Sequence, residues 1–116
     1  MKEKNKKKFT HLKIHSQYSI CEGALKISDL AGFCKKNKTH ALAICDTNNL
    51  CGAIEFSEKI SNVGTQPIIG VQIKFKYKNK YGKISLYAKD IEGYKNLTKL
   101  SSRSYLNIKE TEEPLW

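Results

Sequence analysis

The sequence predicts an α/β fold with parallel strands, and three observations support this class. Strand-like and helix-like patterns alternate through the first half of the chain, which is the order of βαβ units. The run HALAIC, residues 40–45, is almost entirely apolar, as is typical of a strand buried on both faces of a parallel sheet. Val71, Ile73, Phe75 and Tyr77 alternate with polar residues, which indicates a half-exposed strand.

A short strand and a helix are expected first. FTHLKI, residues 9–14, alternates its side chains as a strand does and leads into a loop over residues 16–23. Apolar residues then recur at i, i+3, i+4 and i+7 from Ile27, which predicts a helix over residues 27–38. Ser28 or Asp29 can cap or favour its first turn.

A strand, a second helix and a hairpin follow. The run at 40–45 ends at Asp46, and helical spacing over about 50–62 predicts a helix that Asn48 or Asn49 can cap. A strand starts with PIIG, and a turn at residues 79–82 leads to KISLYA, its expected antiparallel partner. The last expected helix covers about residues 91–105, with Asp90 as its cap.

The chain is short and basic. Its 116 residues suffice for one small domain, with residues 1–8 as a disordered basic tail and 9–116 as the domain. The net charge of +10 is compatible with an anionic partner, but of the 21 basic residues only Arg103 is an arginine, which looks like a coding bias. Five lysines mark the hairpin, either as a solvated face or as a contact to DNA or another subunit: Lys74, Lys76, Lys78, Lys80 and Lys83.

Cysteine usage and hydropathy indicate the compartment. The four cysteines form no C-x-x-C pair, so we expect reduced thiols in a cytoplasmic protein. No run of about 18 apolar residues exists, and no apolar segment follows the charged N-terminus, so we expect neither a membrane span nor a secretory signal.

Polar residues follow three of the expected strands. His15 and Ser16 lie after the first, Asp46 and Thr47 after the second, and Gln72 near the third. In α/β folds chemistry gathers at the carboxyl ends of strands, so these positions predict an active-site-like location. Adjacent residues in an extended segment point apart, so His15 and Ser16 make a poor nucleophile–base pair.

Four blocks carry a resemblance to a known family: HLKIHSQYSICEGALKISDL, ALAICDTNNLCGAIEF, PIIGVQI and EGYKNLTKLSSRSYL. In this order and spacing they resemble the N-terminal PHP (polymerase and histidinol phosphatase) domain of bacterial DNA polymerase III alpha subunits. The resemblance covers about residues 9–106. It implies the first part of a distorted seven-stranded (β/α) barrel, with parallel strands and a β-hairpin, cut from a longer chain.

The resemblance also implies a degenerate metal site. Metal-binding members carry H-x-H, T-D-H-G and a glutamate after I-I-G, and three of these ligands are replaced here by Lys13, Thr47 and Gln72. A protonated lysine offers no lone pair, and threonine and glutamine are poor ligands compared with histidine and carboxylate. The positions that are kept are His15, Glu22 and Asp46. We expect no metal and no catalytic residue here, with the Lys13 ammonium neutralising Asp46 and Glu22 instead.

The function implied is that of a non-catalytic scaffold and docking module in a replicase. The parent chain would be a DNA-directed DNA polymerase that meets DNA, uses magnesium held outside this segment, and has a proofreading exonuclease among its partners. One alternative is a metal-dependent PHP phosphoesterase or 3′–5′ exonuclease, against which the three replacements speak. Another is a free-standing basic nucleic-acid-binding domain, which a steep salt dependence of binding would reveal.

Overall fold

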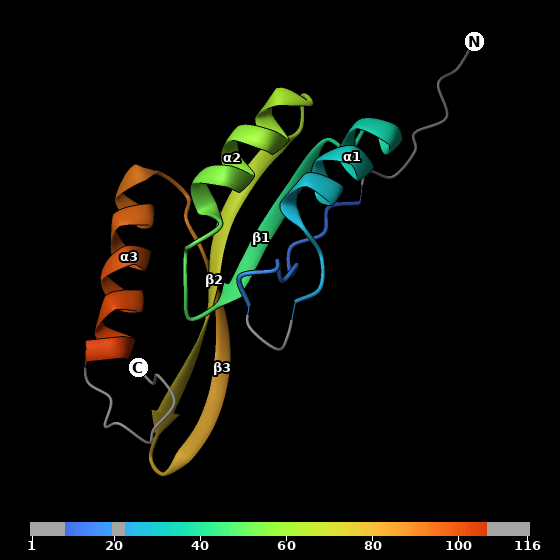
Figure 1. Ribbon diagram of the computed structural model, residues 1–116. Helices are drawn as coiled ribbons and strands as arrows, with labels where there is room; N and C mark the ends of the chain where they lie inside the picture. Colours follow the sequence, from blue (N-terminus) through green and yellow to red (C-terminus); the bar gives the residue numbers. More distant parts are fainter. Residues whose placement is uncertain (1–8, 20–22, 107–116) are drawn as a thin grey trace.

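The computed structural model describes residues 9–19 and 23–106 (Figure 1). The expected basic tail at residues 1–8 and the acidic position Glu22 lie outside the described residues. The elements are α1 (Ile27–Asn37), β1 (Ala41–Thr47), α2 (Ala53–Asn62), β2 (Gln66–Tyr77), β3 (Lys80–Tyr87) and α3 (Ile91–Leu106).

The predicted α/β class is confirmed, with strands in the order β1-β2-β3. β1 pairs in parallel with β2, and the β2–β3 hairpin is antiparallel. Six consecutive residues of β1 are buried, as the apolar run predicted. Within the described residues, no helix is both long and apolar enough to cross a bilayer.

The predicted first strand is wrong. Residues 9–14 are irregular, although they lie along β1: the Ala43 amide donates to the His11 carbonyl at 3.0 Å, and the Cys45 amide donates to the Ile14 carbonyl at 2.8 Å. Two residues of β1 therefore match three residues of the N-terminal segment. A regular ladder needs equal steps on both strands, so the extra residue prevents one from forming.

The helices lie where the apolar spacing placed them, and the predicted cap of α3 is confirmed, since Asp90 Oδ1 accepts the Gly93 amide at 2.8 Å, but the capping of α1 and α2 differs. The residue before α1 is Lys26, which makes no side-chain cap; instead the Ile27 amide donates to the Gln17 side-chain oxygen at 3.1 Å. α2 begins later than expected, after Gly52, while Asn49 accepts the Cys51 amide in the preceding turn. The predicted asparagine cap is therefore wrong, because the turn at residues 48–52 uses that side chain before the helix starts.

The hairpin turn is also shifted. Lys78 and Asn79, with φ of 44° and 61°, form a two-residue turn of the kind that matches strand twist. The predicted turn at residues 79–82 is wrong, since β3 already starts at Lys80 and Gly82 lies opposite Phe75. A Cβ at Gly82 would lie 2.9 Å from that phenyl ring, so glycine leaves room for the ring rather than making the turn.

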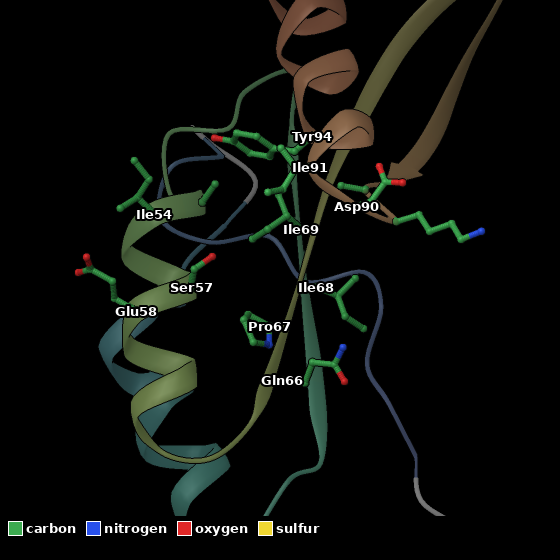
Figure 2. Close-up of a pocket in the computed structure, with 13 residues that line it drawn as sticks. Ile54, Ser57, Glu58, Gln66, Pro67, Ile68, Ile69, Asp90, Ile91 and Tyr94 are labelled. Atoms are coloured by element: carbon green, nitrogen blue, oxygen red, sulfur yellow. The ribbon is translucent and has the colours of Figure 1, made fainter.

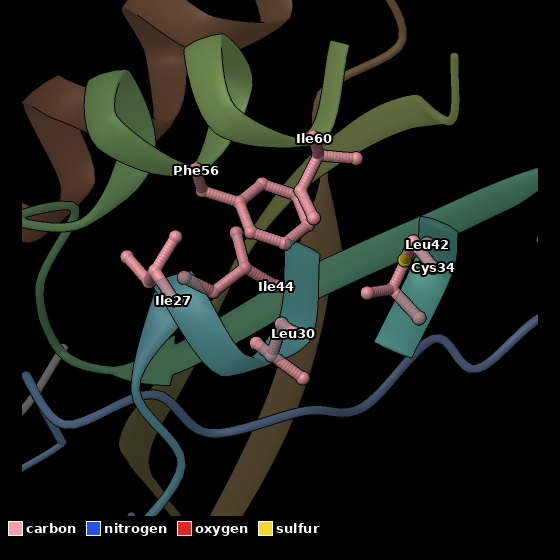
Figure 3. Close-up of a cluster of buried hydrophobic side chains, with 7 residues drawn as sticks. All are labelled: Ile27, Leu30, Cys34, Leu42, Ile44, Phe56 and Ile60. Carbon is pink, nitrogen blue, oxygen red and sulfur yellow. The ribbon is translucent and has the colours of Figure 1, made fainter. Parts of the chain in front are cut away.

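Two apolar clusters hold the helices against one face of the sheet. The larger joins α1, α2 and β1 (Figure 3) and consists of Ile27, Leu30, Cys34, Leu42, Ile44, Phe56 and Ile60. The smaller joins α3 to β2 through Val71, Ile73 and Leu97. Because side chains alternate along a strand, the odd-numbered residues of β1 point to the opposite face of the sheet.

Candidate functional site

Asp46 is the centre of the candidate site. It lies at the carboxyl end of β1, where it is 2% exposed. Oδ1 accepts the Ser16 amide at 2.6 Å and the Ser19 hydroxyl at 2.7 Å, and Oδ2 accepts the Ser16 hydroxyl at 2.7 Å. Three donors thus stabilise a buried carboxylate without a cationic partner among these bonds.

The two serines come from a tight turn that packs against the end of β1. The Ser19 amide donates to the Ser16 carbonyl at 3.0 Å, and the Tyr18 amide donates to the Ser16 hydroxyl at 3.2 Å. The Ser19 hydroxyl also accepts the Thr47 amide at 3.1 Å. Sequence reasoning missed Ser19; the signal was a pair of turn-forming serines three residues apart in the loop preceding the helix.

His15 lies beside this network without forming a catalytic pair. Its Nδ1 is 3.4 Å from the Ser19 hydroxyl oxygen. The Ser16 and Ser19 hydroxyls each donate their single proton to Asp46. A serine nucleophile needs its proton directed to a base that a carboxylate orients. Here the carboxylate binds the serines directly, which agrees with the expectation that His15 and Ser16 are not a nucleophile and its base.

The proposed ion pair between Lys13 and Asp46 is wrong. The described hydrogen bonds to the Asp46 carboxylate come from serines, and the Lys13 side chain is exposed. Burial raises the pKa of the neighbouring Cys45 thiol; hydrogen bonds with Ser85 and Tyr87 oppose the rise, and the charge of Lys13 opposes it less. The other half of the hypothesis, pairing with Glu22, concerns a residue outside the described part.

Thr47 and Gln72 are register partners on neighbouring strands. Because side chains alternate along a strand, both lie on the face opposite the helices. Asp46 lies on the helix-covered face, together with Leu42 and Ile44. The strand ends thus converge as predicted, but their side chains divide between two faces. Gln72 is 4% exposed, and its Oε1 has no hydrogen-bond partner among the described residues.

These donors do not fit a metal cluster. Asp46 already accepts three hydrogen bonds, Gln72 presents a neutral oxygen on the other face, and Lys13 is a cation. A hydrolytic metal site needs imidazoles and carboxylates that converge on one point. In the ranges 9–19 and 23–106, no three histidine, cysteine, aspartate or glutamate side chains gather closely enough to hold an ion.

A second interaction fastens the same turn to α2. The Tyr18 hydroxyl donates to Glu55 at 2.7 Å, and Lys59 forms an ion pair with Glu55 at 3.0 Å. The hydrogen bond from Tyr18 and the nearby Lys59 lower the pKa of Glu55, and the same hydrogen bond raises the pKa of Tyr18. The turn is therefore held from two sides, by Asp46 and by α2.

An apolar groove of about 600 Å³ lies between α2 and α3 (Figure 2). Pro67 and Ile69 of β2 are among its lining residues, and Ile54 and Ile91 are 72% and 75% exposed. None of the predicted site residues that the structure describes lines it. The groove is thus separate from the Asp46 network.

Comparison with known proteins assigns the fold and the family together. Residues 11–115 match the PHP domain. The chain is 40% identical over 116 residues to the DNA polymerase III subunit alpha of Thermus aquaticus, with 88% of this chain and 10% of that protein covered. It is 42% identical over 110 residues to the same subunit of Borreliella burgdorferi, with 85% and 10% covered. The chain thus spans about a tenth of these relatives.

Two solved structures share the fold at low sequence identity. One is a putative metal-dependent phosphoesterase from Bifidobacterium adolescentis, with a TM-score of 0.60, 15% identity, and coverage of 84% of this chain and 35% of that one. The other is an amidohydrolase from Chromobacterium violaceum, with a TM-score of 0.61, 18% identity, and coverage of 78% and 32%. The fold is that of a partial barrel, and the family match extends over nearly the whole chain. This chain therefore belongs to the PHP domain family.

Proposed function

We propose that this chain is a non-catalytic PHP scaffold, the N-terminal part of a replicative DNA polymerase III alpha subunit. The observation that carries the proposal is the use of Asp46. This carboxylate, at a position that the family's metal motif retains, accepts three hydrogen bonds from two serines and fastens a turn to the end of β1. A group that metal-binding relatives would use for chemistry serves packing here.

The three ligand replacements support the same proposal. Lys13 brings a positive charge, and Thr47 and Gln72 bring neutral oxygens, to positions where cation binding needs imidazole or carboxylate. Loss of three ligands removes the charge that holds metal ions and the means to activate water. Such a domain keeps its fold, and its surface can serve as a docking site for other subunits.

The parent activity proposed is templated synthesis of DNA from deoxynucleoside triphosphates. Its magnesium ions would be held by carboxylates outside this chain, and its partners would be other replicase subunits, the proofreading exonuclease among them. Similarity to polymerase III alpha subunits at about two-fifths identity supports this context. A cytoplasmic location follows from the same proposal.

The test is metal analysis of a longer chain that contains the whole PHP domain. Zinc, manganese and iron would be measured by elemental analysis, with a phosphatase assay on the same sample. A matched variant, Lys13→His with Thr47→His and Gln72→Glu, restores the family's ligand types. We expect no stoichiometric metal and no hydrolysis in the wild type, and metal in the restored variant.

One outcome would overturn the proposal, and a second would overturn only its explanation by the three replacements. Stoichiometric metal with metal-dependent hydrolysis in the wild type would make the domain a PHP phosphoesterase or exonuclease. A restored variant that folds, judged by its circular dichroism, yet binds no metal would show that the three replacements are not the cause of the loss.

A further inference from the structure

The β2–β3 hairpin extends beyond the rest of the sheet. β1 pairs with β2 only as far as Gln72, whereas the β2–β3 ladder continues to Tyr77 and Lys80. We call residues 73–84 the tip ribbon. In Figure 1 it projects past the end of β1, and its residues 76–81 are all exposed. A two-stranded ribbon gains little stability from its own pairing, and within the described residues the side chains at 76–81 are exposed and can make other contacts.

Positive charge is concentrated in the tip ribbon. Its twelve residues, IKFKYKNKYGKI, contain five lysines and no acidic residue, in a chain of net charge +10. Lys74 and Lys83 occupy directly opposite positions, and Lys76 follows on the same face. Lys76, Lys78 and Lys80 continue the charge into the exposed end of the ribbon, where clustered like charges strengthen the local positive potential. This arrangement is complementary to a polyanion.

Two exposed aromatic rings lie among these charges. Tyr77 is 64% exposed and Tyr81 is 70% exposed. The Lys76 ammonium lies 5.6 Å from the centroid of the Tyr81 ring, and the Lys78 ammonium lies 5.4 Å from that of Tyr77. Each ring thus has a cation beside it and a face open to solvent. Lysines that only interact with water would not need two exposed aromatic side chains, Tyr77 and Tyr81, beside them.

We propose that the tip ribbon binds single-stranded nucleic acid, with Lys76, Lys78 and Lys80 on the phosphates and Tyr81 stacked on a base. Lysine contacts to phosphate supply affinity without sequence preference, and unpaired bases stack on aromatic rings, which paired bases in a duplex cannot do. This inference does not depend on the scaffold proposal, since the ribbon contains none of the three replaced ligand positions. Metal analysis and nucleic-acid binding can therefore fail separately.

The experiment measures fluorescence anisotropy of a labelled oligothymidylate, titrated with the 116-residue chain at several salt concentrations. The ribbon variant combines Lys76→Gln, Lys78→Gln and Lys80→Gln. The control combines Lys89→Gln, Lys95→Gln and Lys99→Gln, which are exposed lysines outside the ribbon and remove the same charge. Loss of three phosphate contacts lowers the slope of log affinity against log salt by about 2, and the control leaves it near the wild-type value.

Stacking is tested at Tyr81. Tyr81→Ala weakens oligothymidylate binding roughly tenfold, whereas Tyr81→Phe keeps the ring and the affinity. Circular dichroism checks that each variant is folded. The same titrations use duplex DNA of equal length and vesicles of anionic phospholipid.

Four results would overturn the inference. They are no binding by the wild type, equal weakening by the control and ribbon variants, duplex or vesicle binding as tight as single-strand binding, and an unchanged affinity for Tyr81→Ala.

Discussion

Single residues decide where the N-terminal segment lies. Gly70 of β2 is opposite Cys45 on one side and Tyr87 on the other. The Tyr87 ring covers Gly70, and its hydroxyl donates to the Leu12 carbonyl, so this side chain reaches across β2 and β1 to the segment beyond them. Only a residue without a Cβ allows this path, which gives the glycine of PIIG a packing role that the sequence pattern did not reveal.

Gly70→Ala is therefore expected to destabilise the fold by about 1–3 kcal/mol. The added Cβ would lie 2.6 Å from Tyr87 Cδ1 and 3.0 Å from the Leu86 carbonyl oxygen, so the ring must leave and its hydrogen bond is lost. Gly32→Ala is the control: it meets nothing within 4 Å in α1 and should stabilise by about 0.5–1 kcal/mol. Urea unfolding measures both, and equal effects at the two glycines would contradict the packing role.

Tyr87 also predicts a pH dependence. Burial raises its pKa to about 12, so the folded chain favours the neutral phenol. The stability that Tyr87 contributes is complete below pH of about 10, the ordinary tyrosine value, and is lost as the pH rises towards about 12. The stability difference between wild type and Tyr87→Phe should shrink over this interval. Absorbance titration should show a late phenolate, beyond that of Tyr18, that Tyr87→Phe lacks; a wild-type curve identical to that of the variant would refute this.

At the scale of elements, the helix ends are satisfied in different ways: side chains accept amides at the start of α1 and α3, whereas the end of α1 depends on backbone conformation. Lys38 ends α1 in the left-handed region, with φ of 49° and ψ of 47°, and its amide bonds back to the Cys34 carbonyl. Glycine is the residue that adopts this conformation without steric cost. The sequence offered Ser28, Asp29 and Asn48 as caps close to the helices in the chain. In the structure, Gln17 accepts the first amide of α1, and the turn at residues 48–52 leads into α2.

Lys38→Gly should therefore stabilise the chain by about 0.5–1 kcal/mol, because it removes the left-handed strain of an L-residue. Lys35→Gly, inside α1, is the matched control and should destabilise by about 1 kcal/mol. Thermal unfolding followed by circular dichroism separates the two, since the midpoints must move in opposite directions. A midpoint lowered in both variants would argue against the conformation at Lys38.

At the scale of the whole molecule, the irregular N-terminal segment lies along the edge of the sheet that β1 forms. Ile14 packs against the larger apolar cluster, and the His11 and Ile14 carbonyls accept amides of β1. Without this segment β1 would be an edge strand, with donors and acceptors open to a second chain.

Ile14→Asp should detach this segment, because it places a charge against the apolar cluster. Hydrogen exchange at the Ala43 and Cys45 amides should then lose protection, and sedimentation should show self-association. Leu12→Asp is the control, since that side chain is 48% exposed. Protection kept in Ile14→Asp would mean that backbone bonds alone hold the segment.

The sequence by itself determined the fold class, the helices and the strands of the sheet, because apolar periodicity reports directly which faces are buried. The loss of three ligand types at positions 13, 47 and 72 was also readable there. Only the tertiary structure decided which donors Asp46 accepts and that Ser19 joins Ser16 on that carboxylate, because these contacts join residues about 30 positions apart. It also decided that residues 9–14 form no ladder, since register depends on both partners and one extra residue breaks it.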